Sequence, residues 1–189
     1  DACIAALLYQ KELEKLREER NIKLFARIGI NTGEMIVGNM GCSIGEIKRF
    51  DYTVIGDEVN LASRLEGINK YYGTNIIISE NTYEKVKNDF EVRPIDFVKV
   101  KGKNNAVMIF QLIDFKNNIN ETQRRDLEMH SKALENYKNR NWIEAKKLFN
   151  ELVELSDDYI AKQYIERINR YEKSPPPDNW DYIYTFTSK

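Results

Sequence analysis

The stretch that decides the fold is DYTVIGDEVNLASRLEG, which runs from Asp51 to Gly67. Residues 49–57 are interpreted as a β-strand. The apolar residues after this strand recur at helical spacing. They are Leu61, Leu65, Ile68 and Tyr72. Gly73 comes next and is typical of a helix end. The stretch therefore predicts a strand that leads directly into an amphipathic helix.

Two polar residues of this predicted helix, Asn60 and Arg64, are four positions apart. They consequently share one face, one position aside from the apolar stripe of Leu61 and Leu65. Both can point at a ligand while the helix stays packed. Taken alone, the pair is more typical of an exposed polar face than of a ligand site.

The segments before this stretch predict one helix and two strands. Residues 2–19 place Ala6, Tyr9, Leu13 and Leu16 at helical spacing. Such an early helix start, without a capping segment or a preceding strand, predicts that the chain begins inside a domain. Residues 24–31 and 35–40 are predicted strands, and 41–48 are expected to form a hairpin tip.

The segments after it extend the mixed pattern and then change character. Residues 75–79, 92–101 and 107–112 are predicted strands, with a helix at 81–88 between the first two. Residues 116–125 are polar and are interpreted as a linker. Most of the chain beyond residue 125 has helical spacing of small and aromatic residues, which resembles a tetratricopeptide hairpin. The members of this set are Ala133, Leu134, Tyr137, Trp142, Ala145, Phe149, Leu152, Ala161 and Tyr164.

A single helical repeat cannot bury its own face, so this part should lean on the first domain or on another chain. Pro175–Pro177 are expected to stop the last helix, and the aromatic segment 180–186 could pack back in an extended form.

The composition excludes several classes of function. With 29 basic and 30 acidic residues, the chain has no global positive field that would favour nucleic acid or an anionic membrane. Its two cysteines, Cys3 and Cys42, do not form a metal-ligand pattern. No apolar run is long enough to cross a bilayer, so a cytoplasmic segment is expected, although segments upstream could anchor the protein. His130 is expected to be solvated or half-packed, without a role.

Together with ARIGINTGEMIVGNMG from Ala26 to Gly41, the opening stretch closely resembles the class III nucleotidyl cyclases. The match runs from the first helix to about Leu112. It implies an α+β, ferredoxin-like cyclase fold that is incomplete at its N-terminus. The expected organisation is a partial catalytic domain at 1–115, a linker at 116–125, tetratricopeptide-like helices at 126–173 and a Pro/aromatic tail at 174–189.

The resemblance also implies roles for individual residues. Asn60 would orient the ribose, and Arg64 would stabilise charge on the phosphate under attack. Thr53 matches the residue that reads the purine edge, and a threonine there resembles the adenine-selective bacterial and soluble subclass. Lys101 would contact the terminal phosphates, with Lys103 as the fallback. On chemistry alone, Thr53 is also simply a good strand residue, and alternating lysines can protect a strand edge.

The family binds two divalent cations, Mg²⁺ or Mn²⁺, through two aspartates that are expected upstream of this chain. Asp51 and Asp57 match positions that do not bind metal in the family. Class III sites form between two protomers, so this chain would supply one half-site and be inactive alone, with residues 41–48 in the dimer contact. The implied reaction converts ATP to 3′,5′-cyclic AMP and pyrophosphate.

Two other functions stay open at this point. One is a degenerate cyclase-like module that binds a protein partner through its helical tail, and the other is a guanylate cyclase.

Overall fold

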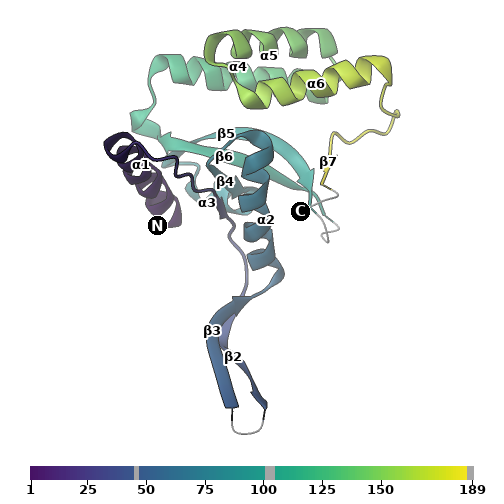
Figure 1. The fold of residues 1–189 in the computed structure, drawn as a ribbon. Coiled ribbons are helices and arrows are strands. Elements are labelled where there is room, and N and C mark those ends of the chain that lie inside the picture. The colour runs from purple at the N-terminus through teal and green to yellow at the C-terminus, as the bar shows by residue number, and fades with distance from the viewer. Residues whose placement is uncertain (45–46, 101–104, 187–189) are drawn as a thin grey trace.

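The computed structural model describes residues 1–44, 47–100 and 105–186. The fold is mixed α+β, as expected, with a sheet, flanking helices and a helical C-terminal part (Figure 1). The helices are α1 (Ala2–Arg20), α2 (Asp57–Tyr72), α3 (Glu80–Val86), the short 3-10 helix η1 (Lys116–Asn118), α4 (Glu121–Lys138), α5 (Trp142–Ser156) and α6 (Tyr159–Lys173). The strands are β1 (Ile28–Ile30), β2 (Ile36–Ile44), β3 (Ile47–Ile55), β4 (Ile76–Ser79), β5 (Phe90–Lys99), β6 (Val107–Phe115) and β7 (Tyr184–Thr185).

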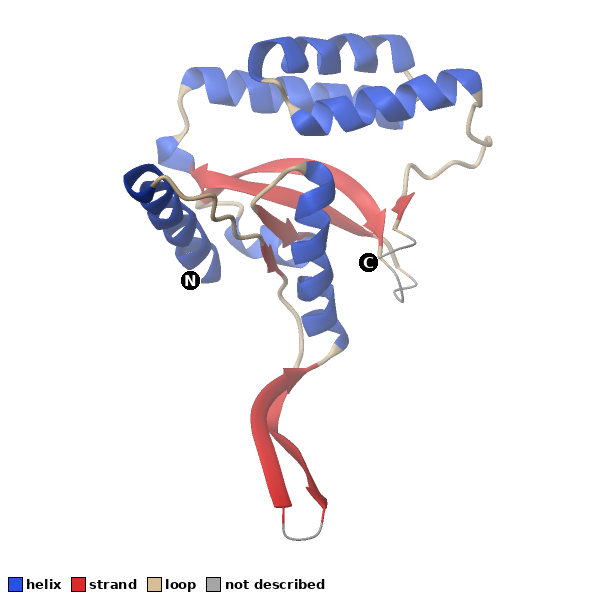
Figure 2. Cartoon of the chain, viewed as in Figure 1, coloured by secondary structure: helices blue, strands red, loops and turns tan. Residues whose placement is uncertain are grey.

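The main sheet has the strand order β1-β4-β6-β5-β7 (Figure 2). Strand β4 pairs in parallel with β1 and antiparallel with β6, and β5 lies antiparallel to β6. Alternate residues of a strand point to opposite faces, and the two faces carry separate cores. Ile77 packs with α2 and the C-terminal helices, whereas Ile76 and Ile78 pack with α1. The sheet is therefore covered by helices on both sides.

Strands β2 and β3 form a separate hairpin that projects from the body of the molecule (Figure 1). The ladder continues to the pair Ile44 and Ile47, so the prediction of a hairpin tip over 41–48 was wrong at both of its ends. Cross-strand pairing extends a ribbon further than turn-forming residues alone suggest. Residues 45–46 lie outside the described part.

The predicted first strand, 24–31, is shorter in the structure. Only Ile28–Ile30 pair with β4, because β4 itself offers a four-residue edge. The predicted linker over 116–125 was also too long. Helix α4 begins at Glu121, because Asn120 accepts a hydrogen bond from the Gln123 amide and the Gln123 side chain accepts one from the Asn120 amide. This capping box starts the helix inside the polar segment.

Helices α4, α5 and α6 lie along the sheet and share one continuous core with α2, β4, β5 and β6. The expectation that this part leans on the first part of the chain is thus confirmed. The tail also behaves as expected: α6 ends at Lys173, and β7 returns to pair in parallel with β5.

The expectation of a solvated or half-packed His130 was wrong. Its side chain is buried, and its two ring nitrogens lie 3.0 Å from Arg93 Nη2 and 2.8 Å from the Pro94 carbonyl oxygen. The sequence of α4 around His130 is polar and gives no sign of this contact, because both partners belong to β5. Among the described residues, none of the helices is long and apolar enough to span a membrane.

Candidate functional site

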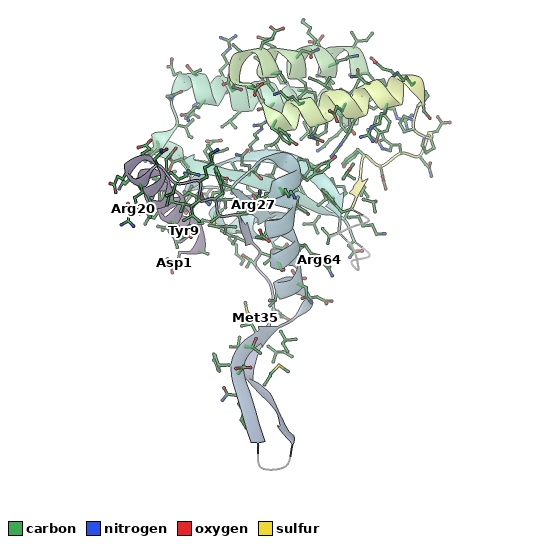
Figure 3. All side chains as sticks on the ribbon, viewed as in Figure 1. Asp1, Tyr9, Arg20, Arg27, Met35 and Arg64 are labelled. Carbon is green, nitrogen blue, oxygen red and sulfur yellow. The ribbon has the colours of Figure 1, made fainter. Side chains whose placement is uncertain are left out.

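Helix α2 carries both predicted catalytic residues. Leu61, Leu65 and Ile68 bury one side of the helix in the core. Asn60 is exposed and Arg64 is half-buried, one turn further along (Figure 3 labels Arg64). Within the described part of the chain, neither side chain has a recorded hydrogen bond or ion pair. The structure therefore presents an amide and a guanidinium together on one accessible helix face, as the spacing predicts.

The start of α2 is held by a polar network that the sequence interpretation missed. Asn31, just after β1, donates from Nδ2 to Glu58 Oε2 at 2.7 Å and to the Glu58 carbonyl oxygen at 3.0 Å. Ser79, at the end of β4, donates to Asn31 Oδ1 at 2.5 Å. The network fixes the first turn of α2, which carries Asn60, against the ends of two sheet strands. The sequence signal that could have predicted this network is a polar residue directly after an apolar strand.

The middle of α2 lies unusually close to β1. A Cβ on Gly29 would sit 2.2 Å from the Ala62 carbonyl oxygen and 2.4 Å from the Glu66 amide nitrogen, so only glycine fits. Buried Asn69 donates to the Ile28 carbonyl oxygen at 3.0 Å and accepts from Thr74 Oγ1 at 2.8 Å. The helix is consequently anchored along its length, and an asparagine beside the apolar stripe was the available signal.

The end of α2 is as predicted. Gly73 caps the helix in the left-handed conformation, with φ of 66°, and its amide donates to the Asn69 carbonyl oxygen. This conformation favours glycine.

The other predicted ligand-binding residues are not brought to Asn60 and Arg64 by any recorded contact. Thr53 is half-buried on β3, opposite Gly38 of β2, near the base of the hairpin. Lys101 and its fallback Lys103 lie outside the described residues. Lys99 is half-buried on β5 and pairs with Thr185 of β7.

The carboxylates of this region do not form a metal centre. Over residues 1–44, 47–100 and 105–186, no group of three or more His, Cys, Asp or Glu side chains could hold an ion. Asp51 and Asp57 are both exposed. Among the described residues, neither aspartate therefore belongs to a cluster of three or more such ligands.

A family model for the adenylate and guanylate cyclase catalytic domain matches residues 3–130, from α1 into α4. The chain belongs to this cyclase family. The match takes in α2 with Asn60 and Arg64, the hairpin with Thr53 and all strands of the sheet except β7.

Relatives of the cyclase domain include adenylate cyclases. The chain is 40% identical over 119 residues to an adenylate cyclase of Anabaena cylindrica. The matched segment covers 57% of this chain and 23% of the relative. It is 35% identical over 126 residues to adenylate cyclase 1 of Rhizobium meliloti, covering 65% of this chain and 18% of the relative. The chain thus spans less than a quarter of the length of these two proteins.

Solved structures of cyclases are also similar to the chain. The crystal structure of the adenylyl cyclase CyaB from P. aeruginosa has 36% sequence identity, covers 62% of this chain and 58% of that chain, and gives a TM-score of 0.48. The guanylate cyclase domain of RhGC from Catenaria anguillulae, in complex with GTP, has 31% identity, covers 48% and 45% of the two chains, and gives a TM-score of 0.37.

Proposed function

We propose that the chain supplies the Asn60 and Arg64 half of an adenylate cyclase site, which converts ATP to 3′,5′-cyclic AMP and pyrophosphate. One observation carries the proposal. An amide and a guanidinium without partners among the described residues share one face of a helix whose start and middle are fixed to the sheet. Such preorganisation is what a site needs to stabilise charge that develops only during the reaction.

In this reaction the ribose 3′-hydroxyl releases its proton to solvent as its oxygen forms a bond to the α-phosphorus, and the bond from that phosphorus to the pyrophosphate oxygen breaks. Asn60 holds the ribose by its amide, so that the 3′-oxygen lies in line with the leaving group. Arg64 donates to the oxygens of the attacked phosphate, whose negative charge is stabilised best by a planar guanidinium. Lys101 binds the terminal phosphates, and the Thr53 hydroxyl accepts a hydrogen bond from the adenine amino group.

The cation ligands lie outside the described residues in this proposal. Mg²⁺ or Mn²⁺ supplies charge neutralisation and activation of the 3′-hydroxyl when it is bound. The partner protomer would bring that half of the site, as the sequence resemblance implies.

The exposed apolar surface of the hairpin supports a second protomer as partner. Ile36 is 73% exposed and Tyr52 is 76% exposed, and neighbouring apolar side chains are exposed with them. The neighbours are Met35, Val37, Met40, Phe50, Val54 and Ile55. These exposed apolar side chains lie on both faces of the ribbon, since successive strand residues point to opposite faces. Exposed apolar surface of this kind marks an interaction site, and a free two-stranded ribbon has little stability of its own.

A complementation assay tests the proposal. The chain is mixed with an intact Anabaena cylindrica adenylate cyclase in which the arginine matching Arg64 is replaced by alanine, and cyclic AMP is measured. The mixture is expected to regain activity, and Arg64→Ala in this chain should lower it by about a hundredfold or more, because one charge-stabilising donor is lost. Replacing ATP by GTP should give less product.

Arg20→Ala is the matched control, because Arg20 is an exposed arginine on α1 and away from α2. It should leave the regained activity unchanged. An absence of cyclic AMP despite demonstrated association of the two proteins, or full activity of the Arg64→Ala chain, would overturn the assignment.

A further inference from the structure

A buried arginine of α6 joins the helical part of the chain to the helix that carries the site. Arg167 is 2% exposed and donates from Nη1 to Asp96 Oδ2 at 2.5 Å and from Nη2 to the Tyr72 hydroxyl at 3.1 Å. The Tyr72 hydroxyl in turn donates to Asp96 Oδ2 at 2.5 Å. Tyr72 is the last residue of α2 and Asp96 lies on β5. Three side chains from three elements thus close one hydrogen-bonded triangle.

Aromatic rings enclose the guanidinium of this triangle. Its carbon lies 3.9 Å from the ring centre of Tyr184 on β7 and 5.0 Å from that of Tyr164 on α6. The Tyr71 hydroxyl, on α2, donates to the Tyr184 hydroxyl at 2.9 Å. A cation over ring faces is attracted by their quadrupoles, and more strongly where water is excluded. The returning tail therefore completes the enclosure around Arg167.

Two further contacts tie the same elements together. A Cβ on Gly73, which caps α2, would lie 2.9 Å from the ring of Tyr159, the first residue of α6. The Phe186 amide, after β7, donates to the Lys99 carbonyl oxygen on β5 at 3.0 Å. Lys99 precedes Lys101 by two positions in the sequence. The C-terminal part thus touches both the end of α2 and the end of β5.

Stability alone is a weak explanation for the triangle. The free energy of desolvating two buried charges offsets much of the attraction between them. Apolar residues of similar volume at such positions often give a fold that is equally stable. A planar guanidinium with two fixed donors instead imposes a definite geometry on its partners. Burial raises the pKa of the Tyr72 hydroxyl well above its ordinary value, with a further contribution from the Asp96 charge, so Tyr72 remains a donor.

We propose that Arg167 is a positioning residue: through Tyr72 and Asp96 it fixes the C-terminal end of α2 relative to β5, and so places Asn60 and Arg64 for the reaction. The helices α4 to α6 are then part of the catalytic unit. The catalytic consequence rests on the proposed function, whereas the mechanical coupling of α6 to α2 does not.

The test compares two tyrosine hydroxyls in the full chain. Tyr72→Phe removes the link from α2 to Arg167 and keeps the ring. Tyr137→Phe is the matched control, because Tyr137 is also a buried tyrosine but packs against Trp142, Tyr164 and Trp180, outside α2. Arg167→Lys is a second test variant, which keeps the charge but cannot hold two partners in a fixed plane.

Hydrogen exchange gives the first measurement and needs no activity. Amides in the last turns of α2 should exchange about tenfold faster in Tyr72→Phe and in Arg167→Lys, because a hydrogen bond to a buried charged cluster is lost. In Tyr137→Phe they should exchange as in the parent chain. Equal exchange of α2 in Tyr72→Phe and Tyr137→Phe would overturn the coupling.

The complementation assay gives the second measurement. Tyr72→Phe and Arg167→Lys should lower kcat by about tenfold to a hundredfold and leave KM for ATP within about twofold, because misplacement acts on the reaction step. Tyr137→Phe should change neither. If faster exchange of α2 leaves kcat unchanged, Arg167 is structural only and the positioning role is overturned. If the parent mixture makes no cyclic AMP, the proposed function fails, and exchange alone then decides whether α6 holds α2.

Discussion

At the scale of single residues, His130 shows how burial sets chemistry. Its pKa is lowered to about 3, first by burial and then by the charge of Arg93. The neutral ring accepts from Arg93 at Nδ1 and donates from Nε2 to the Pro94 carbonyl oxygen. Arg93 also pairs at 2.6 Å with Asp158, the residue that caps the start of α6. Burial acts to raise the pKa of Asp158, but its hydrogen bond with Arg93 and the charge of Arg93 outweigh this and lower it. The ring therefore links α4 to β5 only while it is uncharged.

This arrangement predicts a pH dependence of stability. In the unfolded chain His130 takes up a proton near its ordinary pKa of 6.5, whereas in the folded chain it does so only near 3. Between these values the unfolded state binds more protons, so the free energy of unfolding falls as the pH falls. From pH 7 to pH 5 this one group should contribute about 2 kcal/mol of that loss.

Urea unfolding of the parent chain and of His130→Gln at the two pH values measures this contribution. The variant cannot take up the proton, so its stability should fall less over the same range. Equal losses in the two proteins would show that His130 is not held neutral.

At the scale of elements, α2 depends on close backbone contact with β1. Gly29→Ala should lower the free energy of unfolding by about 1–3 kcal/mol, because the added methyl group meets the backbone of Ala62 and Glu66, which cannot move cheaply. Guanidinium unfolding followed by circular dichroism measures the change.

Gly67→Ala is the matched control in the same helix. Its Cβ would meet nothing within 4 Å, so the substitution should raise stability by about 0.5–1 kcal/mol through the better helix propensity of alanine. Loss of stability in both variants, or in neither, would contradict the close packing of α2 on β1.

The bounds of the helices and strands show how much a sequence pattern can predict. The strand predicted over 49–57 is β3 over Ile47–Ile55, and the end of α2 at Gly73 was predicted to the residue, because helical spacing and a capping glycine are local signals. The tip of the hairpin and the start of α4 were misplaced. Both depend on pairing and capping that compete with the turn and linker character of their residues.

At the scale of the whole molecule, the projecting hairpin carries a group of exposed apolar side chains (Figure 1). Phe50→Thr with Tyr52→Thr removes two exposed rings and keeps residues that suit a strand. The double variant should weaken self-association, or association with an intact protomer, by about tenfold or more. Sedimentation equilibrium measures this change.

Ile143→Thr is the control, because Ile143 is 85% exposed on α5 and lies outside the hairpin. It should leave association unchanged. A chain that remains monomeric at every concentration and binds no protomer would contradict the proposed interface, as would an equal effect of the control.

The sequence by itself pointed to the family and its mixed α+β fold through a long resemblance, which the family model over residues 3–130 confirms. It also placed Asn60 and Arg64 on one helix face, because residues four apart share a face of a helix. The tertiary structure alone decided which polar residues are buried together. Tyr72 meets Asp96 across 24 positions and Arg167 across 95. No local pattern links residues so far apart, since only the packing of α6 against α2 and β5 excludes water from all three and makes them partners.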